Sequence, residues 1–202
     1  MKDLIIASNN AGKIKEYKEL LEQYGFNVLS QSEAGIDIEV EETGTTFEEN
    51  AHLKAYAIYE LTHKNVISDD SGLQVEALNN EPGIYSARYK GLATPEERND
   101  YILNALKRKR NRKAKFYCCI CFIDENGHEE LFKGFWNGTI AKEKSGTNGF
   151  GYDPIFISED GNGKTTASYP LEFKEKYSHR AKATKMLVDY IENSDIFKKC
   201  KK

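Results

Sequence analysis

Two adjacent carboxylates, Asp69 and Asp70, follow the short predicted strand Val66–Ser68 and precede Ser71 and Gly72. Neither solvation nor core packing accounts well for paired carboxylates where a predicted strand ends in a glycine turn. Metal binding or general-base chemistry explains them better. Because side chains alternate along a strand, one carboxylate can face a site while its neighbour bonds to surrounding backbone on the opposite side.

A second candidate is the loop SNNAGK, residues 8–13, which follows the first predicted strand. Glycine beside lysine at the amino end of a helix suggests a phosphate cradle built from backbone N–H groups. The loop is not a P-loop, because Lys13 precedes Ile14 and no glycine lies at the required distance upstream. A solvated lysine behind an asparagine-rich helix cap explains the segment equally well.

A glycine-rich loop, residues 145–154, combines two aromatic rings and a carboxylate in the order Phe150-Gly151-Tyr152-Asp153. Aromatic rings suggest stacking on a nucleobase. A hairpin with both rings packed inward explains the same residues. Cations and hydrogen-bond donors gather near the start of the last predicted helix; they are Lys174, Ser178, His179 and Arg180. The alternative explanation is the ordinary start of a surface helix.

Charge is unevenly distributed along the chain. Between Glu33 and Asn50 lie seven carboxylates and no basic side chain, usually the mark of a solvated face, although a turn at residues 41–44 can present an oxygen ligand to Mg²⁺. From Lys107 to Lys115, seven of nine residues are basic, but no aromatic residue is interleaved for base stacking. Since 29 basic and 32 acidic residues leave a net charge of −3, we expect a solvated basic turn and no nucleic-acid partner.

Four cysteines, at positions 118, 119, 121 and 200, form neither a disulfide framework nor the paired Cys-x-x-Cys spacing of a zinc site. We expect buried, unreactive thiols. The longest apolar run, Phe116–Ile123, has eight residues, far below the roughly 18–20 that a membrane-spanning helix needs. The amino end lacks the central apolar segment of a secretory signal, so we expect a cytoplasmic protein without membrane contact.

The elements that must position these residues alternate between strand and helix. Leu4–Ala7 and Phe26–Ser30 predict strands. Between them, apolar residues at helical spacing from Ile14 to Tyr24 predict a helix that Gly25 ends. In such a β-α-β opening, the strand-to-helix loop lies beyond the carboxyl end of a strand, where ligands commonly bind.

The later part of the chain continues the alternation. Its predicted elements are a helix opened by a capping box at Thr45 or Thr46, the strand Val66–Ser68, a helix from Thr94, hairpin strands at Lys115–Ile123 and Glu130–Ala141, and a final helix at about Ser178–Ile191. Neither a repeat nor a linker interrupts the pattern. We therefore predict one continuous mixed α/β fold over residues 1–202.

Taken together, these segments resemble the inosine triphosphate pyrophosphatase family, whose members hydrolyse non-standard purine nucleoside triphosphates. The matching motifs, in the family's order, are SNNAGK at 8–13, EETGTTFEENAHLKA at 41–55, DDSGL at 69–73, PGIYSARY at 82–89, GFGYDP at 149–154 and SHR at 178–180. The resemblance implies a single domain in which a long mixed sheet and flanking helices form two lobes around a central cleft. It also implies a homodimer.

The activity implied by the resemblance is Mg²⁺-dependent cleavage between the α and β phosphates of ITP, dITP or XTP, which releases the nucleoside monophosphate and pyrophosphate. By motif, Asp70 is the proton acceptor and a metal ligand, and Glu41 is a second metal contact. The same correspondence implies that the substrate is bound by Ser8, Asn9, Asn10, Ala11, Gly12, Lys13, Lys54 and Ser71, and on the base side by Phe150, Gly151, Tyr152, Asp153, Lys174, His179 and Arg180.

The residue types agree with this chemistry. A triphosphate carries about four negative charges near neutral pH, so Lys13, Lys54 and Mg²⁺ are suitable counter-charges. Hypoxanthine and xanthine present an oxygen at C6, which suits the donor-only side chain of Lys174 or Arg180. Two alternatives stay open: a pyrophosphatase of modified pyrimidine nucleotides, and a nucleotide-binding protein that does not hydrolyse its ligand.

Overall fold

Seven strands form one mixed sheet in the computed structural model, which describes residues 2–194. Six of them follow the order β2-β1-β3-β5-β6-β7, and β4 pairs with β3. β1 (Lys2–Ile6) runs parallel to β2 (Phe26–Ser30) and to β3 (Val66–Val75), whereas β4 (Glu81–Pro82) runs antiparallel to β3. Parallel and antiparallel pairs in one sheet with flanking helices confirm the predicted α/β class.

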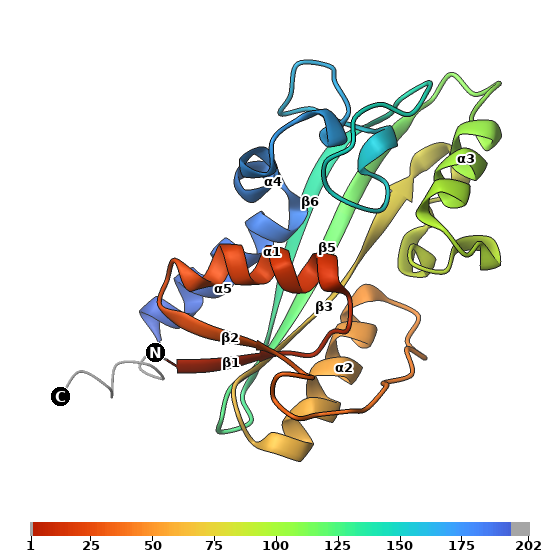
Figure 1. The fold of residues 1–202 in the computed structure, drawn as a ribbon. Coiled ribbons are helices and arrows are strands. Elements are labelled where there is room, and N and C mark those ends of the chain that lie inside the picture. The colour runs from red at the N-terminus through yellow and green to blue at the C-terminus, as the bar shows by residue number, and fades with distance from the viewer. Residues whose placement is uncertain (1, 195–202) are drawn as a thin grey trace. The chain divides into compact units, whose positions relative to one another are not determined.

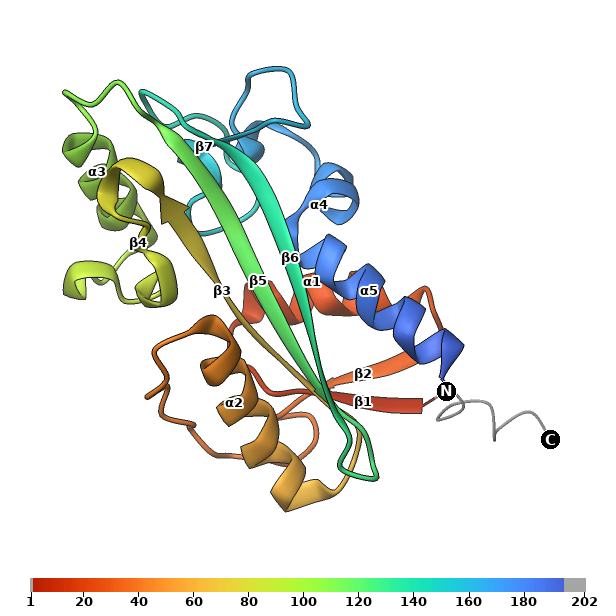
Figure 2. The ribbon, with the colours of Figure 1, turned by 180° about the vertical axis from the view of Figure 1, so that it is seen from behind.

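The second half of the sheet is built from a long hairpin. β5 (Lys113–Ile123) and β6 (Glu129–Ile140) are neighbours, joined by a turn in which Gly127 adopts a φ of 84° (Figure 2). β7 (Phe156–Ser158) then runs antiparallel to β6. Gly138 permits this close pairing, because a Cβ there would lie 2.2 Å from the carbonyl oxygen of Ile157.

The described chain divides into two compact units. Unit 1 consists of the chain up to Asp70, Cys119–Lys133 and the chain from Arg180 onward, and unit 2 consists of Ser71–Cys118 and Gly134–His179. β3, β5 and β6 each contribute residues to both units. Neither unit is therefore one uninterrupted stretch of sequence.

Three helices flank the strands of unit 1. α1 (Ala11–Glu22) and α5 (His179–Asn193) lie on one side of β1 and β2, and α2 (Phe47–Thr62) lies on the other (Figures 1 and 2). Side chains from both sides are fully or almost fully buried, among them Leu4, Ile6, Tyr17, Leu21, Ala51, Ile58 and Leu187. This burial fixes both helix layers against the strands that carry the paired carboxylates.

Local sequence signals set the starts of these helices. The side chain of Asn10 caps α1 by accepting a hydrogen bond from the backbone N–H of Lys13 at 3.1 Å. α2 begins with the predicted capping box: Thr46 Oγ1 accepts from Glu49 N at 3.1 Å, and the Glu49 carboxylate accepts from Thr46 N at 3.3 Å. Such caps satisfy N–H groups that have no partner within the helix.

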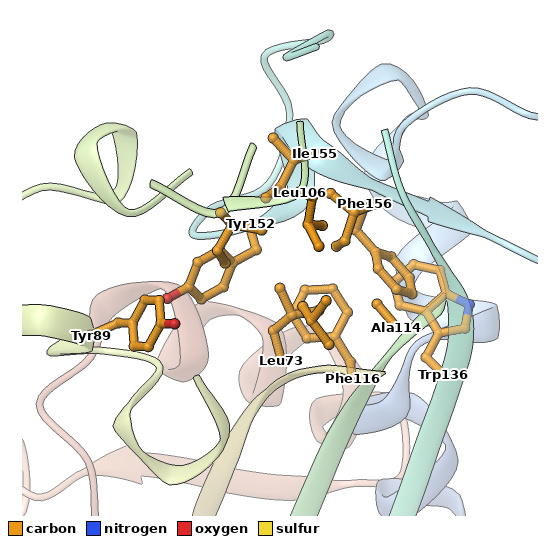
Figure 3. Packing of buried hydrophobic residues seen from close by; sticks show 12 residues of the cluster. Leu73, Tyr89, Leu106, Ala114, Phe116, Trp136, Tyr152, Ile155 and Phe156 are labelled. Carbon is orange, nitrogen blue, oxygen red and sulfur yellow. The ribbon is translucent and has the colours of Figure 1, made fainter. Parts of the chain in front are cut away.

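Unit 2 is organised around a hydrophobic cluster of aliphatic and aromatic residues (Figure 3). The ring of Phe116 lies 4.7 Å from that of Phe156, and the ring of Trp136 lies 5.6 Å from it, measured between centroids. The helices of this unit are α3 (Pro95–Ala105), which starts at the predicted position, and α4 (Leu171–Tyr177). The sequence pattern does not predict α4, a seven-residue helix whose Phe173 ring stacks on Tyr169 at 4.1 Å.

The prediction for the end of β3 is wrong. We expected the strand to stop at Ser68 and Asp69–Gly72 to form a turn, but β3 continues unbroken to Val75. The carboxylates of Asp69 and Asp70 both have polar partners in the interior, and β4 pairs with the strand at Gln74 and Val75. Because these side chains and this part of the backbone have hydrogen-bond partners, Asp69–Gly72 can remain part of the extended strand.

Within the basic run, residues 107–112 connect α3 to β5 and residues 113–115 begin β5. The basic side chains of the connection are largely exposed, as predicted. Arg112 is the exception, because its guanidinium donates to the backbone oxygens of Leu106, Ile140 and Ala141. It ties the end of α3 to the end of β6. Among the described residues, none of the helices has both the length and the apolar character needed to cross a membrane.

We expect Thr46→Ala to lower the free energy of unfolding by about 1 kcal/mol, because the first turn of α2 loses its side-chain cap. Urea denaturation measures this change. Thr46→Ser keeps the accepting oxygen and serves as the matched control, with a loss well below that of the alanine variant. Equal losses in both variants would show that the cap hydroxyl does not stabilise α2.

Candidate active site

Asp69 and Asp70 are neighbouring carboxylates on opposite faces of β3, with side chains 1% and 6% exposed. Asp69 contacts Tyr17 of α1 and Arg180 of α5, whereas Asp70 contacts Lys54 of α2. The predicted alternation is therefore confirmed. The buried neighbour is held by side chains, however, and not by the backbone as we expected.

Asp69 is surrounded by hydrogen-bond donors. Tyr17 Oη donates to Oδ2 at 2.9 Å, Arg180 Nε donates to the same oxygen at 2.8 Å, and Lys13 Nζ donates to Oδ1. Burial alone would raise the pKa of Asp69, but the charges of Arg180 and Lys13 hold that pKa well below its ordinary value. Asp69 is thus a fixed anion that anchors three donors.

Asp70 has a different environment. Lys54 Nζ lies 3.3 Å from its Oδ1, and Asn50 Nδ2 lies 3.4 Å from its Oδ2. Burial raises the pKa of Asp70, an effect that Lys54 and Lys13 only partly offset. A carboxylate whose protonated form is favoured in this way is a better proton acceptor than its neighbour Asp69.

Two ammonium groups converge on one backbone oxygen. Lys13 Nζ donates to the carbonyl oxygen of Asp69 at 3.2 Å, and Lys54 Nζ donates to the same oxygen at 2.8 Å. Burial lowers the pKa of Lys54, but the neighbouring carboxylates of Asp70 and Glu42 outweigh it, so the pKa is raised overall and the ammonium stays charged. The two ammonium groups can serve as counter-charges for phosphate oxygens, although the carboxylates of Asp69, Asp70 and Glu42 already pair with them.

The predicted phosphate loop leads directly into this pair of lysines. Ser8 Oγ accepts from Asn10 N at 3.2 Å, and Asn10 caps α1, which positions Lys13 in the first helical turn. Asn9, Asn10 and Ala11 are exposed. The amino end of a twelve-residue helix, reached through an exposed loop and followed by a lysine, suits a phosphate group.

Carboxylate oxygens near Lys54 make a suitable donor set for a divalent cation. Glu42 Oε1 lies 2.7 Å from Lys54 Nζ, on the same ammonium group that contacts Asp70. Glu41, the predicted metal contact, directly precedes Glu42 in the sequence and is exposed. Hard oxygen ligands suit Mg²⁺, and a buried carboxylate such as that of Asp70 is stabilised by a nearby cation. Sequence reasoning singled out Glu41 and missed the contact made by Glu42.

A second group of predicted residues gathers in unit 2. Lys174 Nζ donates to Asp153 Oδ2 at 2.7 Å and lies 4.7 Å from the centroid of the Phe150 ring. The same Asp153 carboxylate accepts from Phe150 N at 2.9 Å and from Thr166 Oγ1 at 2.9 Å. Lys174 and Asp153 are buried, whereas Phe150 is 37% exposed. Lys174 thus lies over a partly exposed aromatic ring.

The loop that carries Phe150 depends on glycines and on one asparagine. Gly149 has a φ of 75°, and a Cβ there would lie 2.0 Å from Asp153 Oδ2. Asn99 of α3 donates from Nδ2 to the carbonyl oxygen of Gly151 at 3.0 Å. Sequence reasoning missed Asn99, because its position on α3 gives no sign that it reaches the loop.

Three predicted base-side residues have environments that the motifs did not reveal. Tyr152 lies in the core cluster (Figure 3) and donates to the Ser86 carbonyl oxygen at 2.7 Å, so its ring packs inward, which was the alternative explanation of this loop. The His179 ring is buried and stacks on Phe116 at 4.8 Å. Arg180 belongs to unit 1, where its guanidinium contacts the carboxylates of Asp69 and Glu16.

The predicted site residues thus form two groups. The group in unit 1 contains Ser8, Asn9, Asn10, Ala11, Gly12, Lys13, Glu41, Lys54, Asp70 and Arg180, and the group in unit 2 contains Ser71, Phe150, Gly151, Tyr152, Asp153, Lys174 and His179. Unit 1 offers cations, a helix amino end and a proton acceptor. Unit 2 offers an exposed aromatic ring beside a buried lysine.

Comparison with known proteins relates the chain to one family. The model of the Ham1 family matches residues 4–190. A dITP/XTP pyrophosphatase of Staphylococcus epidermidis is 47% identical over 193 residues, covering 95% of this chain and 97% of that protein. The dITP/XTP pyrophosphatase of Bacillus subtilis is 45% identical over 195 residues, covering 95% and 98%. The solved Ham1 protein of Staphylococcus aureus has a TM-score of 0.84 at 45% identity, covering 95% of this chain and 98% of that one.

We expect Asp69→Asn to lower the free energy of unfolding by about 3–5 kcal/mol, because the buried charges of Arg180 and Lys13 lose their common partner. Urea denaturation near neutral pH gives the value. Asp189→Asn, at an exposed position on α5, is the control and should change stability by less than about 0.5 kcal/mol. A loss as small as that of the control would contradict the anchoring role.

The pH dependence of this loss follows from the same contacts. The pKa of Asp69 is lower in the folded chain than its unfolded value of about 3.9, so its stabilising contribution is complete above about pH 5 and decreases as pH falls through the folded value. The stability difference between the parent and Asp69→Asn should therefore shrink from neutral pH to about pH 3. A difference that is constant over this range would show that the folded carboxyl is not acidified.

Proposed function

The chain belongs to the Ham1 family, and we propose on that premise that it is a nucleoside triphosphate pyrophosphohydrolase acting on non-standard purine nucleotides. It hydrolyses ITP, dITP and XTP to the nucleoside monophosphate and pyrophosphate and so removes them from the nucleotide pool. One observation carries the assignment of the site: the ammonium groups of Lys13 and Lys54 meet at the carbonyl oxygen of Asp69, directly beside Asp70.

Unit 1 binds the triphosphate. Lys13 and Lys54 offset the charge of the phosphates, and the backbone N–H groups at the start of α1 supply further donors. Lys54 is held in place by Glu42, the Asp69 carbonyl oxygen and Asp70, so its ammonium group is already positioned and exchanges one of these contacts for a phosphate oxygen. Preorganised charges of this kind stabilise the charge that develops on the phosphoryl oxygens during transfer.

Asp70 is the proton acceptor in this proposal. Hydrolysis between the α and β phosphates needs a water molecule to lose a proton as its oxygen attacks phosphorus. The carboxylate of Asp70 accepts that proton, and Asn50 and Lys54 fix its orientation. Mg²⁺, held by Asp70 with Glu41 or Glu42, would supply charge neutralisation on the phosphate oxygens.

Unit 2 reads the base. The exposed Phe150 ring stacks on the purine, and Lys174, a donor without acceptor capacity, favours the C6 oxygen of hypoxanthine or xanthine over the C6 amino group of adenine. Asp153 fixes Lys174 through a 2.7 Å contact, which keeps the donor in one position. Sites of this type reject a ligand that leaves a buried donor unpaired.

In this scheme Arg180 binds the carboxylates of Asp69 and Glu16 and does not contact the base. Its Nε donates to Asp69, and its Nη1 contacts Glu16, so the guanidinium is engaged by two carboxylates of unit 1. By fixing Asp69, it fixes the carbonyl oxygen to which both lysines are bound.

The homodimer, the Mg²⁺ dependence and the cytoplasmic location stay predictions from the sequence.

We expect Asp70→Asn to reduce turnover of ITP by about 10²–10⁴-fold while nucleotide binding persists, because the amide cannot accept the proton. The assay follows inosine monophosphate and pyrophosphate separately with Mg²⁺ present. Asp189→Asn, at its exposed position, controls for loss of a carboxylate elsewhere. Turnover within about tenfold of the parent would remove Asp70 from the role of base. Orthophosphate as the sole phosphate product would contradict the proposed function.

We expect Lys174→Ala to reduce the preference for ITP over ATP by about tenfold or more, with a smaller effect on the maximal rate for ITP, since the C6 oxygen loses its donor. The measurement is kcat/KM on a panel of purine and modified pyrimidine triphosphates. Lys176→Ala, two positions along α4 and exposed, is the matched control. An unchanged preference would exclude Lys174 from base recognition, and a preference for pyrimidines would favour the alternative substrate class.

A further inference from the structure

Three potential metal ligands meet in unit 1 at a place the proposed function does not use. The ligand atoms of His52, Cys121 and Glu129 all lie within 4.8 Å of one another. They come from α2, from β5 and from the first residue of β6, positions far apart in the sequence. Cysteine spacing alone therefore gave no sign of them.

The three side chains are already oriented toward each other. His52 Nδ1 lies 2.7 Å from Glu129 Oε2, and the Glu129 carboxylate accepts a hydrogen bond from the thiol of Cys121. The ring of Tyr56, one turn further along α2, stacks on the His52 ring with centroids 5.5 Å apart. The stacked ring limits rotation of His52 and so lowers the entropy that ligand binding would cost.

The donor set and its spacing suit a borderline transition metal. Imidazole nitrogen, thiolate sulfur and carboxylate oxygen are the three ligand types of Zn²⁺ sites, with bonds of about 2.0–2.3 Å. Around a tetrahedral ion, ligand atoms then lie about 3.3–3.8 Å apart. The present distances need only small side-chain adjustments to reach that geometry. A hard cation such as Mg²⁺ would not select a site with a sulfur ligand.

The site also has a way in from solvent. Cys121 is fully buried, but the side chains of His52 and Glu129 are 43% and 33% exposed. An ion can reach the cluster from the exposed side and keep a water molecule in its fourth position. The three protein ligands would leave one coordination position of the ion for that water.

We propose that His52, Cys121 and Glu129 form a binding site for one Zn²⁺ ion, separate from the site that binds the phosphates. As the bond between Cys121 Sγ and the metal forms, the thiol proton leaves to solvent, and the Nδ1 atom of neutral His52 and the Glu129 carboxylate supply the other two electron pairs. Bound Zn²⁺ joins α2 to the hairpin of β5 and β6 and stabilises unit 1. This inference does not depend on the proposed function.

Zn²⁺ binding at this cluster leaves Lys54 in place. His52 and Lys54 are two positions apart on α2, so their side chains project about 200° apart around the helix. Lys54 contacts Glu42 and Asp70, whereas His52 contacts Glu129. Substitution of His52 should therefore leave hydrolysis with Mg²⁺ unchanged.

The test is isothermal titration of Zn²⁺ into tag-free, chelator-treated protein with Mg²⁺ in excess, so that hard oxygen sites are occupied. We expect one Zn²⁺ per chain, a higher melting temperature with Zn²⁺, and an affinity about tenfold or more lower in His52→Gln. His63→Gln, which removes a histidine at the end of the same helix, is the matched control and should bind like the parent.

Co²⁺ gives a readout that does not depend on stability. In the parent it should produce the sulfur-to-cobalt charge-transfer absorption of a thiolate ligand, and Cys121→Ser should lose that band while Cys118→Ser, a buried thiol at an alternate strand position, keeps it. Unchanged Zn²⁺ affinity in His52→Gln would overturn the proposal. A Co²⁺ complex of the parent without a thiolate band would do so too, as would a band that persists in Cys121→Ser.

Discussion

Two carboxylates buried next to each other in β3 are the constraint on which the rest of unit 1 depends. Removing Asp69 and Asp70 from water is costly unless cations and hydrogen-bond donors replace the lost hydration. α1 and α5 provide those partners on one face through Tyr17, Lys13 and Arg180, and α2 provides them on the other through Lys54. The helices that cover the strand are thus also the source of the charges that a triphosphate needs.

In unit 2, too, a buried carboxylate is surrounded by hydrogen-bond donors. Here one buried carboxylate, Asp153, collects the ammonium of Lys174, the N–H of Phe150 and the hydroxyl of Thr166. The carboxylate does no chemistry of its own in the scheme proposed above. It converts a flexible lysine and a glycine-rich loop into a donor and a ring with fixed positions, which is the requirement for distinguishing an oxygen from an amino group.

Local chemistry predicted from the sequence was confirmed where it acts over a few residues. The caps at Asn10 and Thr46 and the strand Phe26–Ser30 lie where the pattern placed them. Long-range contacts were not accessible in this way: Arg180 reaches Asp69 across 111 positions, and nothing in either segment specifies that pair. The other differences between the predicted and the observed structure arise where polar side chains are buried. The pattern placed a turn at Asp69–Gly72 and left open whether the Tyr152 ring stacks on a base or packs inward, because a sequence does not show which polar groups have interior partners.

The oxygen that binds both lysines belongs to the main chain of Asp69 and not to its side chain. Lys13 and Lys54 are attached to a main-chain carbonyl, which every amino acid at that position would offer. Conventional side-chain mutagenesis therefore leaves this acceptor chemically intact, and only the path of the strand decides where it lies. The position of this acceptor in the proposed site is thus set by the backbone. An amide-to-ester exchange, which weakens that carbonyl as an acceptor, is a chemical change that would alter it.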